Sequence, residues 1–76
     1  MTLNCLAIDD EPLALDIVAS FIEKTPFLKL AGRCENALNA IERINSENID
    51  LIFLDIEMPD ISGIQLLNSL QRKPLV

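Results

Sequence analysis

The sequence predicts an α/β fold with a mostly parallel sheet, in the order β-α-β-α-β-α. Short apolar segments alternate with segments whose apolar residues recur at helical spacing. Residues 49–54 are almost continuously apolar, which is typical of a parallel strand buried on both faces. No repeat, low-complexity tract or linker interrupts this alternation. We therefore expect one parallel sheet with helices on both faces and the strand order 2-1-3.

The first half of the chain is predicted to form a strand, a helix and a second strand. Residues 3–8 are short and apolar and end at two acids, so we predict a buried strand. Pro12 suits the first turn of a helix, where its missing N–H does no harm. Pro26 ends that helix, because the residue before a proline avoids the α region. Residues 27–34 form the second strand, which Gly32 interrupts or ends. The apolar stripe of the helix contains Ala14, Ile17, Val18, Phe21 and Ile22.

The second half of the chain is predicted to form two more helices around a third strand. Asn36 is a suitable cap for the second helix. Residues 45–48 then form a loop, and residues 49–54 form the third strand. Ser62 caps the third helix, and Pro74 ends it. The apolar positions are Ala37, Ala40, Ile41 and Ile44 in the second helix, and Ile64, Leu67 and Leu70 in the third.

Composition excludes several classes of protein. The chain has 76 residues and a mass of 8.5 kDa, so it is at most one domain. Its 12 acidic and 6 basic residues argue against direct nucleic-acid binding, which needs clustered Lys and Arg. No run approaches the ~20 apolar residues of a membrane span, and no export signal is visible. We therefore expect a cytoplasmic protein without membrane association.

The cysteine and histidine counts limit the kinds of metal site and catalytic site that the chain can form. Cys5 and Cys34 lie in apolar surroundings and are predicted to be reduced core thiols. A disulfide or a metal pair is the alternative, which the absence of a CxxC motif disfavours. The sequence has no histidine, which excludes most zinc sites and Ser-His-Asp or Cys-His catalysis.

Acidic residues follow two strands that we expect to be neighbours. Asp9 and Asp10 follow the first strand, and Asp55 follows the third. In an open parallel sheet such residues meet at the carboxyl edge, where strand order reverses. Three carboxylates so close repel one another unless a cation sits among them, and an all-oxygen site suits Mg²⁺. A carboxylate beside the metal can attack phosphorus and form an aspartyl phosphate. The alternative is that each acid caps a helix or lies in solvent.

Two motifs resemble the signatures of bacterial two-component response-regulator receiver domains. They are residues 6–12 (LAIDDEP) and residues 51–59 (LIFLDIEMP), with Gly63 four residues after Pro59. The chain looks most like receivers that precede LytTR-type DNA-binding domains. The resemblance implies a flavodoxin-like fold. It also implies that residues 1–76 are the N-terminal part of a receiver, whose fourth and fifth strands and last two helices would follow.

The resemblance implies a role for each acid. Asp55 would be the phosphoacceptor, and its donor would be a phosphohistidine on a sensor histidine kinase. Asp10 would bind Mg²⁺ directly, Asp9 directly or through water, and the main-chain carbonyl of Glu57 would be a further ligand. Such a domain assists its own phosphorylation and dephosphorylation but is not an enzyme acting on a separate substrate.

The resemblance implies that two strands and two helices of a receiver are not in this chain, and this leads to further expectations. The hydroxyl and lysine side chains that follow the fourth and fifth strands in receivers would be absent, which weakens phosphorylation of this chain. Strand 49–54 and one flank of the first helix would be uncovered, so we expect a homo-oligomer through that strand or through helix faces. Two alternatives remain at this point. One is an inactive structural fragment that oligomerises. The other is a Mg²⁺-dependent phosphatase with an aspartate nucleophile, for which Glu57 would replace the usual second aspartate.

Overall fold

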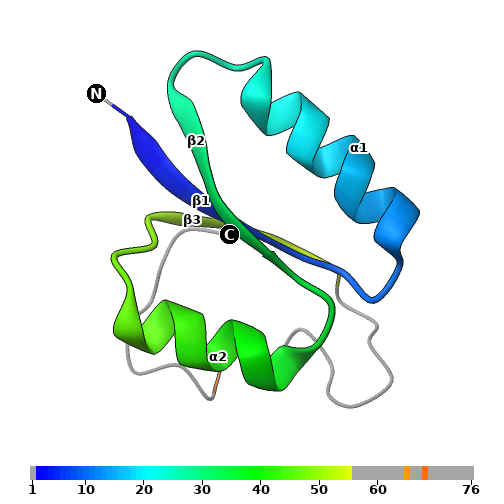
Figure 1. The fold of residues 1–76 in the computed structure, drawn as a ribbon. Helices are drawn as coiled ribbons and strands as arrows, with labels where there is room; N and C mark the ends of the chain where they lie inside the picture. The colour runs from blue at the N-terminus through cyan, green and yellow to red at the C-terminus, as the bar shows by residue number, and fades with distance from the viewer. Residues whose placement is uncertain (1, 56–64, 66–67, 69–76) are drawn as a thin grey trace.

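The chain folds as a parallel sheet with helices on its two faces (Figure 1). The computed structural model describes residues 2–55, 65 and 68. The elements are β1 (Leu3–Ile8), α1 (Pro12–Glu23), β2 (Leu28–Cys34), α2 (Ala37–Ser46) and β3 (Leu51–Leu54). The sheet order β2-β1-β3 confirms the predicted order 2-1-3. The third predicted helix lies outside the described residues, apart from Gln65 and Asn68, which are helical and exposed.

Strand β1 is the centre of the sheet and aligns the carboxyl ends of its neighbours. Ile8 pairs with Cys34 on β2 and with Leu54 on β3. The register of β1 with β2 shifts between Cys5 and Leu6, where Ala31 is an extra residue on β2. With this shift, the carboxyl ends of the three strands lie at the same level along the sheet. Consequently, the residues that follow β1 and β3 start from neighbouring points on one edge.

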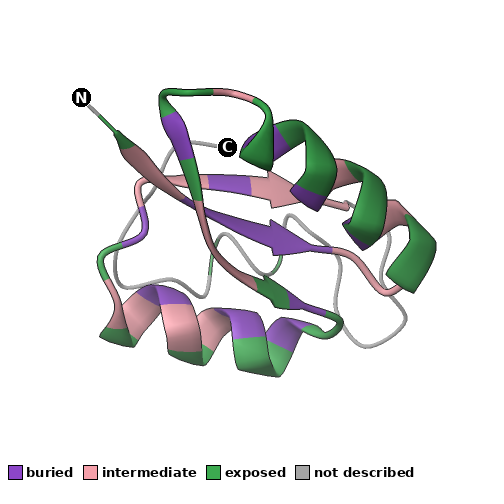
Figure 2. Cartoon of the chain, turned by 45° about the horizontal axis from the view of Figure 1, so that its top comes forward, coloured by how far each residue is buried: buried purple, intermediate pink, exposed green. Residues whose placement is uncertain are grey.

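The two helices cover opposite faces of the sheet (Figure 2). Side chains alternate along β1, so Leu6 and Ile8 pack in one buried cluster with α2, while Cys5 packs in a second cluster with Ile22 of α1. This is the arrangement that right-handed crossovers produce. Cys5 and Cys34 are both free and buried, which agrees with the predicted core thiols. Within the described part of the chain, no helix is long and apolar enough to cross a membrane.

Helix α2 matches its predicted start and core face. The Asn36 side chain accepts a hydrogen bond from the Asn39 N–H at 2.9 Å, which caps the helix. Its buried residues are Ala37, Ala40 and Ile44. The predicted loop at residues 45–48 begins too early, because the helix continues to Ser46. There the Ser46 hydroxyl donates to the carbonyl of Glu42, four residues back, so this polar residue bonds within the helix.

The predicted core face of α1 is wrong for two of its five residues. Ile17 and Phe21 are 72% and 56% exposed, and the buried residues of the helix are Leu15, Ala19 and Ile22. The segment has apolar residues around most of its circumference, so helical spacing fits more than one stripe. Packing against β1 and β2 selects the stripe through Leu15 and leaves Ile17 on the outside.

Gly32 interrupts the second strand rather than ending it, because β2 continues to Cys34 and its register with β1 shifts between Leu30 and Gly32. The Arg43 guanidinium reaches from α2 across this position and donates to the Ala31 carbonyl at 3.0 Å. It also donates to Glu47, from Nε to Oε2 at 2.8 Å. A Cβ atom at Gly32 would overlap the guanidinium. The glycine therefore makes room for an arginine that ties α2 to β2.

Candidate metal centre

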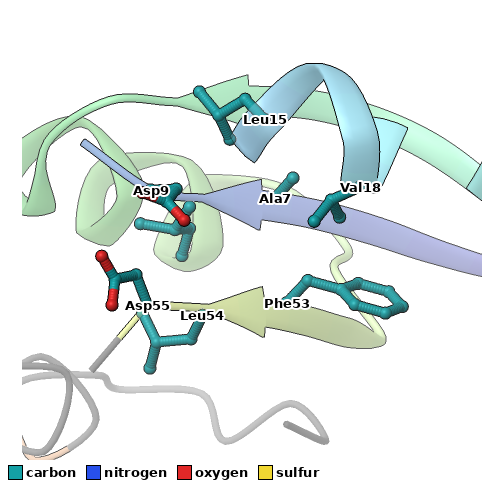
Figure 3. Close-up of a pocket in the computed structure, with 8 residues that line it drawn as sticks. Ala7, Asp9, Leu15, Val18, Phe53, Leu54 and Asp55 are labelled. Carbon is teal, nitrogen blue, oxygen red and sulfur yellow. The ribbon is translucent and has the colours of Figure 1, made fainter. Parts of the chain in front are cut away.

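Three carboxylates meet at the carboxyl edge of the sheet. Asp9 and Asp10 follow β1, Asp55 follows β3, and one oxygen from each lies within 4.8 Å of the others. Figure 3 shows the carboxylates of Asp9 and Asp55 turned toward each other from the ends of their strands. The structure therefore brings together all three acids that the sequence singled out. The fourth predicted ligand, the main-chain carbonyl of Glu57, lies outside the described residues.

Backbone hydrogen bonds of the sheet hold two of these acids in place. The Asp55 N–H donates to the Ile8 carbonyl at 3.0 Å, and the Asp9 N–H donates to the Cys34 carbonyl at 3.1 Å. These bonds extend the parallel ladder by one residue beyond β1 and β3. The sheet thus holds the backbone of both acids, so that their side chains start from fixed positions, as a preorganised site requires.

The alternative role of helix cap applies only in part to Asp9. Its Oδ1 accepts a hydrogen bond from the Glu11 N–H at 2.9 Å, which shapes the turn that leads into α1. The N-cap residue itself is Glu11, whose side chain makes no capping bond. Asp9 therefore supports the turn through Oδ1, which leaves the remaining acceptor capacity of its carboxylate for another ligand.

The electrostatics of the cluster favour a bound cation. Burial raises the pKa of the Asp10 carboxyl, and the charges of Asp55 and Asp9 raise it further. A cation among the three acids would reverse this repulsion. The three carboxylates would supply the oxygen ligands that Mg²⁺ prefers, and water could supply the remaining ligands.

An apolar cavity of about 260 Å³ adjoins the acids on the α1 side of the sheet (Figure 3). Asp9 and Asp55 lie at one end of it, and its other walls come from β1, α1 and β3. The apolar lining residues are Ala7, Ile8, Leu15, Val18, Phe53 and Leu54. Apolar walls lower the effective dielectric beside the carboxylates and so strengthen their interaction with a cation. The sequence did not indicate this cavity, because it depends on how α1 is rotated over the sheet.

Comparison with known proteins identifies the family. The family model described as "Response regulator receiver domain" matches residues 5–76. The chain belongs to this receiver family. Its fold agrees with a solved structure, the response regulator domain of Thermotoga maritima CheB. The two share 29% identity with a TM-score of 0.85, over 91% of this chain and 52% of that one. The expected flavodoxin-like receiver fold is thus confirmed.

Curated relatives of this receiver chain are response regulators of greater length. An uncharacterized response regulatory protein of Shewanella oneidensis is 38% identical over 65 residues, which cover 86% of this chain and 28% of the relative. The transcriptional regulatory protein BtsR of Escherichia coli is 35% identical over 68 residues, which cover 90% of this chain and 28% of BtsR. The receiver chain therefore spans less than a third of the length of these relatives.

Proposed function

We propose that this receiver chain binds Mg²⁺ through Asp9, Asp10 and Asp55 and accepts a phosphoryl group on Asp55 from a sensor histidine kinase. The observation that supports the proposal is the convergence of three carboxylate oxygens within 4.8 Å, in a chain of the receiver family. The main-chain carbonyl of Glu57 is part of the proposed ligand set. A bound Mg²⁺ supplies the positive charge that stabilises phosphoryl oxygens during transfer.

Each acid of the proposed site has a different role in phosphoryl transfer. An oxygen of the Asp55 carboxylate attacks the phosphorus of the donor phosphohistidine as the P–N bond breaks. The electron pair of that bond remains on the imidazole nitrogen, which takes up a proton. Asp9 and Asp10 would hold the metal, and the bond from the Asp55 N–H to the Ile8 carbonyl keeps the nucleophile at the strand end. Positioning and charge neutralisation are the main contributions that such a transfer needs.

The wider role follows from the family and stays a proposal. The chain would act as the receiver of a two-component system, with itself as the phosphorylated species rather than an enzyme acting on a separate substrate. Because one relative is named a transcriptional regulatory protein, we propose that the whole protein regulates transcription. The LytTR-type subfamily, the cytoplasmic location and the homo-oligomer expected from the sequence also stay predictions.

Intact mass spectrometry tests the proposal directly. The protein is incubated with Mg²⁺ and a small acyl phosphate, beside an Asp55→Asn variant and a matched Asp16→Asn variant. Asp16 lies on α1 and is paired with Arg33, away from the cluster. We expect a gain of one phosphoryl group in the wild type and in Asp16→Asn, abolished by a chelator and absent in Asp55→Asn. No gain in the wild type, or the same gain in Asp55→Asn, would contradict the proposal.

A further inference from the structure

The side chain of Arg43 connects α2 to the last residues of β2. Its guanidinium donates to the Ala31 carbonyl at 3.0 Å and to both carboxylate oxygens of Glu47, at 2.8 and 3.1 Å. The Arg43 side chain is 32% exposed, so most of it is enclosed between the two elements. Burial raises the pKa of the Cys34 thiol, and the charge and hydrogen bond of the guanidinium oppose that rise. Arg43 therefore contacts β2 at two residues, while Glu47 holds the guanidinium in place.

Arg43 meets β2 at the point where the strand contains an extra residue. The register of β2 with β1 passes from Leu30 to Gly32 and leaves out Ala31. The extra residue of such a bulge has no partner in the ladder of the sheet. Here the guanidinium supplies a donor to its carbonyl, and the missing side chain of Gly32 gives the guanidinium room. Arg43 thus holds the residue of β2 that the ladder does not hold.

The bulge decides which way the end of β2 faces. Ala31 packs in the α2 cluster, and Gly32 lies under the guanidinium, so two successive positions face α2. Arg33 then faces α1, where it pairs with Asp16, and Cys34 returns to the α2 cluster. A slip of one residue would turn both of these side chains to the opposite face. The orientation of the last two residues of β2 therefore depends on the bulge.

The end of β2 supports one acid of the metal centre and not the other. The Asp9 N–H donates to the Cys34 carbonyl of β2, whereas the Asp55 N–H donates to the Ile8 carbonyl of β1. The backbone of Asp9 is thus fixed by the strand that Arg43 holds. The backbone of Asp55 is fixed by the central strand of the sheet.

We propose that Arg43 is a positioning residue of the metal centre, which holds the bulge in β2 and thereby fixes the Cys34 carbonyl that supports Asp9. Residues that orient a ligand without touching the metal are a regular part of metal sites. The inference rests on the proposed function for its metal. The positioning of Asp9 itself is measurable in the metal-free protein.

Amide hydrogen exchange, followed by NMR without metal, is the first test. Arg43→Ala should accelerate exchange of the Asp9 amide about tenfold more than exchange of the Asp55 amide, because only the first loses its support. The Asp55 amide reports any general loss of stability. Lys29→Ala is the matched control, because it removes the same charge from an exposed position nearer the start of β2. It should leave the ratio of the two exchange rates unchanged.

A second variant removes the same contact from the side of β2 and serves if Arg43→Ala fails to fold. The methyl group of Gly32→Ala would overlap the guanidinium and displace it. The backbone of Gly32 has no positive φ, so alanine is not strained there. Gly32→Ala should therefore also accelerate exchange of the Asp9 amide. In the Arg43→Ala background it should have no further effect, because the methyl group then meets no guanidinium.

Calorimetric titration with Mg²⁺ tests the consequence for the metal. Arg43→Ala should weaken Mg²⁺ binding about tenfold. Loss of a positive charge alone would strengthen binding, as we expect for Lys29→Ala, so the sign of the change separates positioning from charge. In an Asp9→Asn background, Arg43→Ala should weaken binding much less, because its effect acts through the Asp9 carboxylate.

Three outcomes would overturn these inferences, and they are distinguishable. Equal acceleration of the Asp9 and Asp55 amides in Arg43→Ala and in Gly32→Ala would mean that Arg43 only stabilises the fold as a whole. Unchanged or tighter Mg²⁺ binding in Arg43→Ala would overturn its role toward the metal. A wild type that binds no Mg²⁺ would overturn the proposed function and this role with it, whereas the exchange ratio, measured without metal, would still show whether Arg43 positions Asp9.

Discussion

The two sides of the sheet differ in how completely their helices cover them. On the α2 side, Leu6, Ile8 and Ile52 are buried in a cluster with α2. On the α1 side the buried cluster contains Cys5, Ile22 and Leu28, and Phe53 of β3 is only half-buried. The apolar cavity also lies on the α1 side. The α2 side of the sheet therefore contains the larger buried cluster, and the α1 side contains the cavity.

The sequences of the two helices explain this difference. Helix α2 presents one narrow stripe to the sheet, in which Ala37, Ala40 and Ile44 are buried. Helix α1 is apolar around most of its circumference and packs on β1 and β2, which leaves the same face of β3 partly open. The α2 side is thus suited to holding the strands in register. The α1 side contains the cavity beside the acids.

The largest expected effect comes from removing a side chain on each side of the sheet. Ile44→Ala on α2 should lower the free energy of unfolding by about 2–5 kcal/mol, because it leaves a cavity in a closed core. Phe53→Ala on β3 should cost less, because its ring is already half-exposed and borders open space. Urea denaturation of both variants measures the difference. Equal losses would show that the two sides are packed equally well.

A smaller effect distinguishes the starts of the two helices. Asn36→Ala should lower the free energy of unfolding by about 1 kcal/mol, because the Asn39 N–H loses its capping acceptor. Glu11→Ala at the start of α1 should change it by less than about 0.5 kcal/mol, because the Glu11 side chain makes no capping bond. The same denaturation measurement compares the two variants. A larger loss in Glu11→Ala would mean that α1 depends on its first residue more than α2 does.

The smallest expected effect concerns the acids at the carboxyl edge. Because folding raises the pKa of Asp10, the folded state disfavours its charged form. Without metal, the contribution of Asp10 to stability should therefore be largest below the unfolded-state pKa of about 3.9 and should be lost as pH rises through the higher folded-state value. Asp10→Asn should remove this decline and slightly raise the Tm of the metal-free protein at neutral pH.

Added Mg²⁺ should stabilise the wild type more than it stabilises the Asp10→Asn variant. Added Mg²⁺ should raise the Tm of the wild type at neutral pH, because it binds only the folded state. The Asp10→Asn variant should need at least about tenfold more Mg²⁺ for the same rise in Tm, because one charged ligand is lost. Thermal melts with and without Mg²⁺ measure both effects. An unchanged Mg²⁺ response in Asp10→Asn would exclude Asp10 from the metal site.

The sequence was sufficient for features that depend on local pattern and on parallel topology. The strands and the cap at Asn36 follow from hydrophobic spacing and residue type, although β3 begins at Leu51 rather than at residue 49. The strand order follows from the alternating parallel topology. The meeting of Asp9 with Asp55 follows because carboxyl ends of neighbouring parallel strands share one edge. Their proposed roles in metal binding and phosphoryl transfer still rest on the family.

Features that depend on the choice between similar packings could not be predicted. Two stripes of α1 have helical spacing, and only contact with the sheet decides that Leu15 is buried and Ile17 is exposed. The cavity beside Asp55 follows from that choice. The position of Arg43 over Gly32 could not be predicted either, because the pattern does not indicate which side chain of α2 reaches across to β2.

The contact of Arg43 with β2 has a consequence for aggregation. An edge strand with unpaired backbone groups is a template for strand addition by another chain, and β2 lies at one edge of the described sheet. In this strand the Ala31 carbonyl already accepts a bond from the guanidinium, and the extra residue breaks the regular spacing of the strand. A bulge and a positive charge are two of the devices that keep edge strands from pairing. By admitting the arginine, Gly32 makes this edge of the sheet a poorer template for strand addition by another chain.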